Sequence, residues 1–250
     1  MVRGGALWHE VLVLETVDST NSVVAERARA GAPEGFVVVA EEQSAGRGRL
    51  DRTWSAPPRA AVLLSALLRP RGVATSAWPL VGLLTGLAVV EALGAVARVD
   101  AVLKWPNDVL VEGSKLGGIL VERVDGALVV GIGINVSTRS DELPVDTATS
   151  LALAGGSTDR EMIVKELLRA LDRRYAAWID RGGVSSSVVP AYREHCETIG
   201  LQVELRLPGG DVVRGLASDV DDNGHLVVRE AGGAVRSWQA GDVTHVRKAH

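Results

Sequence analysis

The segment 43–54, QSAGRGRLDRTW, combines three kinds of residue that suit an anion-binding site. Glycines let backbone N–H groups approach a ligand closely, arginines offer planar guanidinium groups that match phosphate or carboxylate, and a tryptophan ring can stack on a nucleobase. These residues are Gly46, Gly48, Arg47, Arg49, Arg52 and Trp54. The same composition also suits an exposed basic surface loop, so the segment alone leaves both interpretations open.

A second segment, LKWPNDVLVEGSKLGG (residues 103–118), holds Lys104 and Lys115, two of only four lysines in a chain with 23 arginines. A compact ammonium group at a crowded site explains this placement, and chance explains it equally well. Asp108 stands across a Trp-Pro turn from Lys104. It can offer an oxygen ligand to Mg²⁺, or simply form a local ion pair with Lys104.

Several common chemistries have no motif in the chain. It lacks a G-x-x-x-x-G-K-[ST] loop, a G-x-G-x-x-G fingerprint, a G-x-S-x-G elbow and an H-E-x-x-H helix, and its five histidines form no ligand-spaced pair. The single cysteine, Cys196, rules out an internal disulfide and fits a reducing cytoplasm. The start, MVRGGALWHE, has no apolar signal core, and the net charge of −4 argues against a general nucleic-acid binder.

The elements that must position these residues fall into two parts. Residues 1–199 alternate strand-like valine-rich runs with amphipathic helical stretches, which predicts a mixed sheet with flanking helices. The continuously apolar run AAVLLSALLRP predicts a strand covered on both faces. Residues 200–250 show short alternating runs separated by PGG, DDNG and AGG, which predicts a small five-stranded barrel.

One stretch, residues 77–97, is almost entirely apolar and has the length of a membrane-spanning helix. Glu91 interrupts it, and no basic cluster flanks it. We therefore expect a buried core helix and no membrane association.

Five motifs, taken in order, resemble those of the biotin protein ligases. They are DSTN (residues 18–21), AGRGR with RTW (45–49 and 52–54), KWPND (104–108), KLGGIL (115–120) and GIGIN (131–135). The resemblance extends from about residue 12 to residue 247. Only about 17 residues precede DSTN, so the chain is similar to the short form that lacks an N-terminal DNA-binding domain.

The resemblance implies an α+β fold: a mixed sheet with flanking helices, like the catalytic domain of class II aminoacyl-tRNA synthetases, followed by a C-terminal SH3-like barrel. It implies an ATP-dependent ligase that forms biotinyl-5′-AMP and pyrophosphate, with Mg²⁺, and then passes biotin to a lysine of a carrier domain of biotin-dependent carboxylases. Such a reaction needs cations and hydrogen-bond donors but no nucleophilic side chain, which agrees with the missing triad.

The family's functional residues map onto positions of this chain. The implied catalytic residues are Lys115, Arg47 and Arg49. The implied biotin-binding residues are Ser19, Thr20, Asn21, Gln43, Arg47, Gly48, Arg49, Lys115, Gly117 and Gly118. The implied nucleotide-binding residues are Arg52, Trp54, Lys104, Asn107, Gly131, Gly133, Asn135 and Arg247, and Asp108 is the candidate for Mg²⁺. The resemblance also predicts that the segment 44–54 is a mobile lid over the bound biotin.

One departure from the family pattern lies inside this lid. Many members read G-R-G-R-x-G-R-x-W, whereas Leu50 and Asp51 replace x-Gly here. Two other functions compete with biotin ligation. Lipoate–protein ligation would use a similar fold, and a nucleic-acid-binding module would use the arginines and the barrel, although the acidic pI opposes it.

Overall fold

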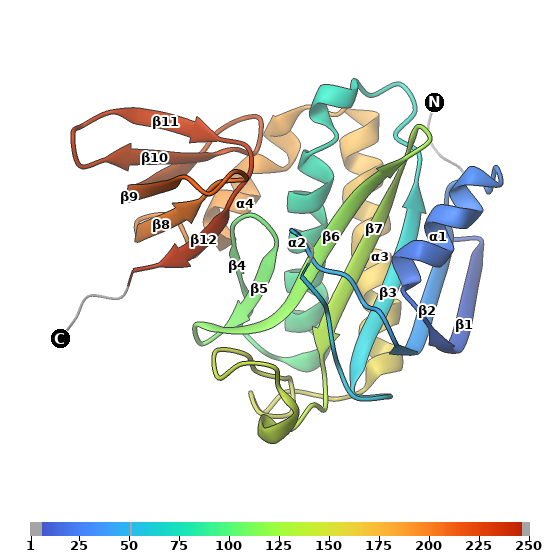
Figure 1. Ribbon diagram of the computed structural model, residues 1–250. Coiled ribbons are helices and arrows are strands. Elements are labelled where there is room, and N and C mark those ends of the chain that lie inside the picture. The colour runs from blue at the N-terminus through green and yellow to red at the C-terminus, as the bar shows by residue number, and fades with distance from the viewer. Residues whose placement is uncertain (1–6, 51, 247–250) are drawn as a thin grey trace.

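Two β-sheets organise the protein in its computed structural model, which describes residues 7–50 and 52–246 (Figure 1). The first sheet contains β1 (Glu10–Val17), β2 (Phe36–Gln43), β3 (Ala61–Leu68), β4 (Val102–Lys104), β5 (Asp108–Val111), β6 (Ser114–Val124) and β7 (Ala127–Asn135). Their spatial order is β1-β2-β3-β7-β6-β5-β4. The β1–β2 pair is parallel and the other pairs are antiparallel, so the predicted mixed sheet is confirmed.

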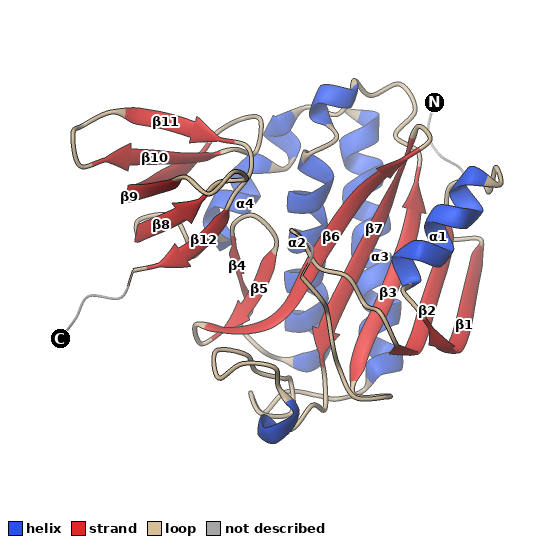
Figure 2. Cartoon of the chain, in the orientation of Figure 1, coloured by secondary structure: helices blue, strands red, loops and turns tan. Residues whose placement is uncertain are grey.

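Helices cover both faces of this sheet (Figures 1 and 2). The long helices α2 (Leu80–Ala92) and α3 (Arg160–Asp180) pack on one face, and α1 (Thr20–Arg29) packs on the other. All eight residues of β3 are buried because alternate side chains enter the two cores: Leu64 and Leu68 face α2 and α3, whereas Leu67 faces α1. The strand predicted to be covered on both faces is therefore confirmed.

The apolar stretch that raised the membrane question forms α2 and the helical turn that continues it. Over residues Leu80–Ala97 the mean hydropathy is 2.1, which is enough to span a membrane by length and composition alone, but 67% of this stretch is buried inside the protein. Its side chains pack against α3 and β6. The helix is thus the buried core helix that the sequence predicts.

The second sheet follows the short helix α4 (Val189–His195). It contains β8 (Gln202–Arg206), β9 (Val212–Val220), β10 (Leu226–Glu230), β11 (Val235–Trp238) and β12 (Asp242–His245), in the antiparallel order β11-β10-β9-β8-β12. Gly210, Gly224 and Gly233 have positive φ in the connections, where a side chain would be strained. The five short strands predicted after residue 200 are confirmed.

Trp105 joins the two sheets. Its ring is buried, its Nε1–H donates to the carbonyl oxygen of Gly224 at 2.9 Å, and its backbone N–H donates to Thr198 Oγ1 at 3.0 Å. The segment leading to the second sheet also pairs with β4, because Glu197 N donates to the carbonyl oxygen of Leu103 at 2.8 Å. The tryptophan of KWPND is therefore a structural joint between the sheets and does not line the candidate site described below.

His245 completes this joint and gives it a pH dependence. Its Nε2 lies 3.1 Å from Thr198 Oγ1, and burial, with Lys104 nearby, lowers the pKa of His245 to about 4. The unfolded chain takes up a proton on this ring as the pH falls through about 6.5, whereas the folded chain takes it up only near pH 4. The contribution of the ring to stability is therefore complete above pH 6.5 and is lost as the pH falls toward 4.

We expect His245→Gln, which keeps a polar side chain beside Thr198, to reduce the loss of stability between pH 6.5 and pH 4. The ring is half-buried, which limits the expected difference to about 1–2 kcal/mol in the free energy of unfolding. Urea unfolding of both proteins at pH 7, 5.5 and 4.5 measures it. Parallel pH profiles for the two proteins would contradict the assignment.

Candidate active site

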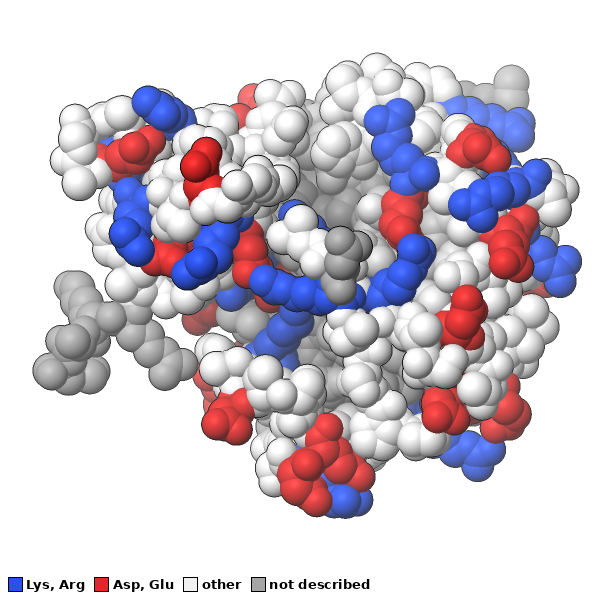
Figure 3. Space-filling model, viewed as in Figure 1, with Lys and Arg blue, Asp and Glu red and all other residues white. Residues whose placement is uncertain are grey.

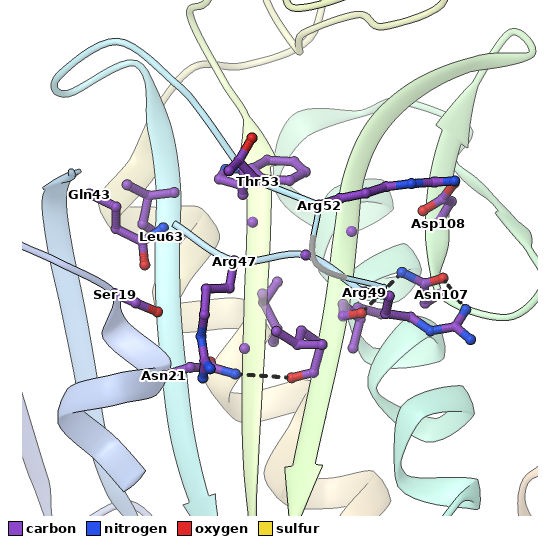
Figure 4. A pocket seen from close by; sticks show the side chains of 18 of the residues that line it. Ser19, Asn21, Gln43, Arg47, Arg49, Arg52, Thr53, Leu63, Asn107 and Asp108 are labelled. Carbon is purple, nitrogen blue, oxygen red and sulfur yellow. Dashed lines mark hydrogen bonds between the residues drawn. The ribbon is translucent and has the colours of Figure 1, made fainter. Parts of the chain in front are cut away.

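A pocket opens over the middle of the first sheet, and residues 44–50 and 52–54, which we call the lid, cross it (Figure 4). Most residues predicted for the site do line this pocket. They are Ser19, Thr20, Asn21, Gln43, Arg47, Gly48, Arg49, Arg52, Trp54, Asn107, Asp108, Lys115, Gly118, Gly131 and Gly133. Segments far apart in sequence are therefore brought together as the motifs predict. The pocket also contains Asp242, which belongs to the second sheet and which sequence reasoning missed.

The described residues of the lid form a small hairpin. Arg47 and Thr53 pair as an antiparallel bridge, Gly48 N donates to the carbonyl oxygen of Arg52 at 2.7 Å, and Trp54 N donates to that of Gly46 at 2.9 Å. Each lid arginine then contacts the body of the protein. The predicted mobility of the lid stays a prediction, but its closed position has specific partners. Asp51 lies outside the described residues.

Glycines form the floor of the pocket and admit neighbouring side chains. A Cβ atom at Gly133 would lie 2.6 Å from Trp54 Cε2, and one at Gly131 would overlap Asn21 Oδ1. Gly118 lies beneath the same tryptophan ring. The sequence predicts that a ligand approaches these glycines closely. In the structure the side chains of Trp54 and Asn21 lie against them. Gly117 serves a different purpose, because its Cβ would lie 2.5 Å from the carbonyl oxygen of Gly133 on the adjacent strand β7.

One end of the pocket is neutral and polar. The Oε1 atom of Gln43 accepts from the backbone N–H of Thr20 at 2.8 Å and lies 3.0 Å from its hydroxyl group. Ser65 Oγ lies 2.7 Å from Thr20 Oγ1 and 2.6 Å from Asn21 Oδ1, beneath the pocket. Ser65 was missed by sequence reasoning, although it is the one polar residue in the apolar run of β3. This end is suited to a ligand head that both donates and accepts hydrogen bonds.

The other end is charged. Lys115 Nζ and Asp108 Oδ1 form an ion pair at 2.6 Å, and Arg52 pairs with Asp242. Among the described residues Asp108 therefore pairs with Lys115, and the ion pair predicted between Lys104 and Asp108 is wrong. A bulge in the β5–β6 ladder after Val109 brings Lys115 beside Asp108.

Arg49 differs from the other cations of this end. Its Nη1 donates to Asn107 Oδ1 at 2.9 Å and lies 3.4 Å from the carbonyl oxygen of Gly241, and the bond to Asn107 is drawn in Figure 4. Within the described chain it has no carboxylate ion-pair partner. Burial lowers the pKa of Arg49, despite the nearby Asp108 and Asp242. An incoming anion would therefore favour the charged form of Arg49.

Asp242, unlike Arg49, already has an ion-pair partner, because Arg52 pairs with it. Burial is the largest single influence on the pKa of Asp242 and raises it, but the hydrogen bond and charge of Arg52, together with the charges of Lys104 and Arg49, outweigh burial and lower that pKa. The same bond raises the pKa of Arg52. Figure 3 shows Lys and Arg side chains in a band across the middle of this face, interrupted by acidic groups. Among the described residues, Arg47, Arg52 and Lys115 of the pocket are each paired with a carboxylate, and Arg49 is not.

Three predicted residues, Gly117, Asn135 and Lys104, are not part of the pocket lining, and a fourth cannot be placed. Asn135 is buried, and its Nδ2 donates to the carbonyl oxygen of Thr149 at 3.0 Å. Thr149 N in turn donates to the carbonyl oxygen of Lys115 at 2.8 Å, so Asn135 braces the backbone that carries Lys115. Lys104 lies on edge strand β4, outside the pocket lining. Arg247 lies outside the described residues.

Metal ligation receives limited support from the described residues. They contain no group of three or more His, Cys, Asp or Glu side chains placed to hold a metal ion. Asp108 fits a narrower role, because Mg²⁺ is commonly held by one or two carboxylates together with substrate phosphates. Its partly buried carboxylate faces the charged end of the pocket, where Lys115 already pairs with it.

The fold and this two-ended pocket define the class of the protein. The model of the biotin/lipoate A/B protein ligase family matches residues 13–138, and that of the biotin protein ligase C-terminal domain matches residues 198–246. The chain belongs to the biotin/lipoate A/B protein ligase family. Within that family it belongs with the biotin protein ligases, because the second match covers the five-stranded sheet.

Individual relatives agree with this placement. The biotin–[acetyl-CoA-carboxylase] ligase of Mycobacterium tuberculosis is 39% identical over 251 residues, covering 99% of this chain and 93% of that protein. The bifunctional ligase/repressor BirA of Bacillus subtilis is 33% identical over 94% of this chain and 72% of its own length. The biotin protein ligase from Aquifex aeolicus in complex with biotin and ATP superposes with a TM-score of 0.82 at 28% identity, covering 96% of this chain and 100% of that one.

Proposed function

We propose that this chain activates biotin with ATP to give biotinyl-5′-AMP and pyrophosphate, and then transfers biotin to one lysine of a carrier domain of a biotin-dependent carboxylase. The observation that carries the proposal is that one pocket combines a neutral hydrogen-bonding end with a charged end that holds Lys115, Arg49 and Arg52. A ureido ring suits the first end, and a carboxylate beside a triphosphate suits the second. Related ligases of the family are named for this reaction.

Biotin binding uses the neutral end. Ser19, Thr20 and Gln43 surround the ureido ring with hydroxyl and amide groups, and Asn21 is held in place behind them by Ser65. Gly48 and Gly118 leave room for the bicyclic ring and valeryl chain between the lid and the sheet. This arrangement points the biotin carboxylate along β6 toward Lys115.

Activation of biotin uses the charged end of the pocket, which holds Lys115, Arg49 and Arg52. A carboxylate oxygen of biotin attacks the α-phosphorus of ATP, and the bond to the pyrophosphate leaving group breaks. Lys115 and Arg49 stabilise the charge that the two anions bring together, with Arg52 and Asn107 beside them. Trp54, with Gly118 and Gly133 beneath it, forms the apolar wall on which the nucleotide base rests, and Gly131 leaves room for Asn21 beside it. Asn135 supports Lys115 through Thr149, and Lys104 adds positive charge from β4.

Mg²⁺ is the cation that ordinarily accompanies ATP, and Asp108 is the residue that would hold it. Bound there, the ion would neutralise charge on the triphosphate. The Lys115–Asp108 ion pair would then exchange for contacts of each group with the nucleotide complex. This leaves the lysine free to face the carboxylate.

Transfer requires the carrier to approach the lid. The amine of the acceptor lysine attacks the biotinyl carbonyl carbon, a C–N bond forms, and the C–O bond to AMP breaks. Until then the closed lid excludes water from the mixed anhydride. A cytoplasmic location fits this partner and the unpaired, buried thiol of Cys196.

Mass spectrometry of a biotin carboxyl carrier domain incubated with the protein, biotin and MgATP tests the proposal. We expect the gain of one biotinyl group on one lysine, and none when ATP is omitted. Lipoate in place of biotin serves as the specificity control. Modification by lipoate but not by biotin would replace the proposed substrate, and no modification by either would contradict ligation.

A further inference from the structure

Glu122 is a carboxylate at the site that none of the recognised motifs contains. It lies on β6, and Arg47 of the lid donates to both its carboxylate oxygens, at 2.9 Å to Oε1 and 2.7 Å to Oε2. Asn21 Nδ2 also donates to Glu122 Oε2, at 2.6 Å. One side chain thus ties the lid to the start of α1 and to the central sheet.

The position of this contact decides what the Arg47–Glu122 pair can do. Glu122 lies four residues beyond Gly118 on β6, about 13 Å along the strand and away from the cationic end. Figure 4 shows Arg47 extending toward Asn21, whereas Arg49 points toward Asn107. The guanidinium of Arg47 is therefore placed at the neutral end of the pocket, although the family resemblance implies a catalytic role for this residue as well.

The carboxylate of this pair lies outside the pocket. Arg47 lines the pocket but Glu122 does not, so Glu122 holds the Arg47 guanidinium from beyond the lining of the neutral end. The ligand head at this end is neutral under the proposed function, so it offers Arg47 no competing anion. The pair consequently favours the closed lid with or without biotin.

We propose that Glu122 is a positioning residue for biotin: its charge holds the lid closed through Arg47, and its Oε2 orients the amide of Asn21. This inference rests on the proposed function and deepens it. A positioning role at the neutral end predicts a change in the KM for biotin with little change in kcat, because the reacting atoms lie at the other end.

Glu122→Gln separates the two contacts. The glutamine retains an oxygen that accepts from Asn21 Nδ2 and nearly the same shape, but it loses the charge that binds Arg47. We expect the KM for biotin, measured by pyrophosphate release at saturating MgATP, to rise about five- to tenfold with kcat within twofold. Without any ligand, trypsin should cut after Arg47 about fivefold faster.

Glu15→Gln is the matched control. Glu15 pairs with Arg59 at 2.8 Å on the exposed surface, so the same change there removes a comparable ion pair away from the pocket. We expect neither the KM nor the lid cleavage to change. Arg47→Gln removes the same ion pair by changing the other partner. The double variant Arg47→Gln/Glu122→Gln should therefore have a KM no higher than that of the more affected single variant.

An unchanged KM and unchanged cleavage in Glu122→Gln would overturn the proposal, as would additive effects in the double variant. A lower KM would show that Glu122 competes with the ligand for Arg47, which also overturns it. Failure of the wild-type protein to release pyrophosphate with biotin would instead refute the proposed function. The ligand-free cleavage rates would then still report on the lid.

Discussion

Lys115→Ala should reduce adenylate formation by a hundredfold or more. In the proposed reaction the ammonium group faces the attacking carboxylate and the α-phosphate, and a preorganised charge at such a position contributes several kcal/mol to the transition state. The loss has a second source in this structure. Without Lys115, the partly buried Asp108 loses its ion-pair partner and repels the incoming triphosphate.

Pyrophosphate release with biotin and MgATP measures this effect. Lys165→Ala is the matched control, because Lys165 pairs with Glu161 on the exposed face of α3, and we expect it to leave the rate unchanged. Lys115→Arg keeps the charge on a bulkier group and should recover part of the activity. A Lys115→Ala rate within threefold of wild type would rule out the assigned role.

Gly131→Ala should weaken biotin binding at least thirtyfold, although it adds a single methyl group. That methyl group would overlap Asn21 Oδ1 and would lie 2.9 Å from Asn21 Cγ. The asparagine cannot move aside cheaply because Ser65 and Glu122 each hold its amide group at 2.6 Å. Displacing it disorders the polar end of the pocket and costs about 1–3 kcal/mol of stability.

Isothermal titration with biotin, together with thermal unfolding, measures both effects. Gly94→Ala is the control, because Gly94 is exposed and a Cβ atom there meets nothing within 4 Å. We expect Gly94→Ala to bind biotin normally. Normal binding by Gly131→Ala as well would mean that the position of Asn21 has no influence on the ligand.

Local sequence patterns predicted the two-part fold, and the resemblance of five short motifs to those of the biotin protein ligases predicted most of the pocket lining. Apolar periodicity predicted the sheet and the core helix, and regularly spaced glycine turns predicted the second sheet. The glycines and arginines of residues 43–54 suggested an anion-binding segment, and the family resemblance identified the lid and the glycines of the pocket floor. None of these inferences needs the position of a residue from elsewhere in the chain.

The missed residues are those whose role comes only from a distant partner. Glu122 sits 75 positions from Arg47, and Asp242 sits 190 positions from Arg52. A glutamate on a strand and an aspartate after a glycine are unremarkable in sequence. The ion pair between Lys104 and Asp108 was inferred from their closeness across a turn. The bulge that brings Lys115 beside Asp108 cannot be seen in the sequence, so that inference was wrong. The roles proposed for individual residues stay predictions.

The joint at Trp105 has a consequence for how the molecule melts. The buried cluster beneath α2 and α3 continues into the second sheet through Val203, Leu205 and Val228, so the two sheets share one apolar interior. Unfolding of the second sheet alone would expose that interior to water and would remove the Gly224 carbonyl oxygen to which Trp105 Nε1–H donates. Heat should therefore unfold both sheets in a single calorimetric peak, with equal van't Hoff and calorimetric enthalpies.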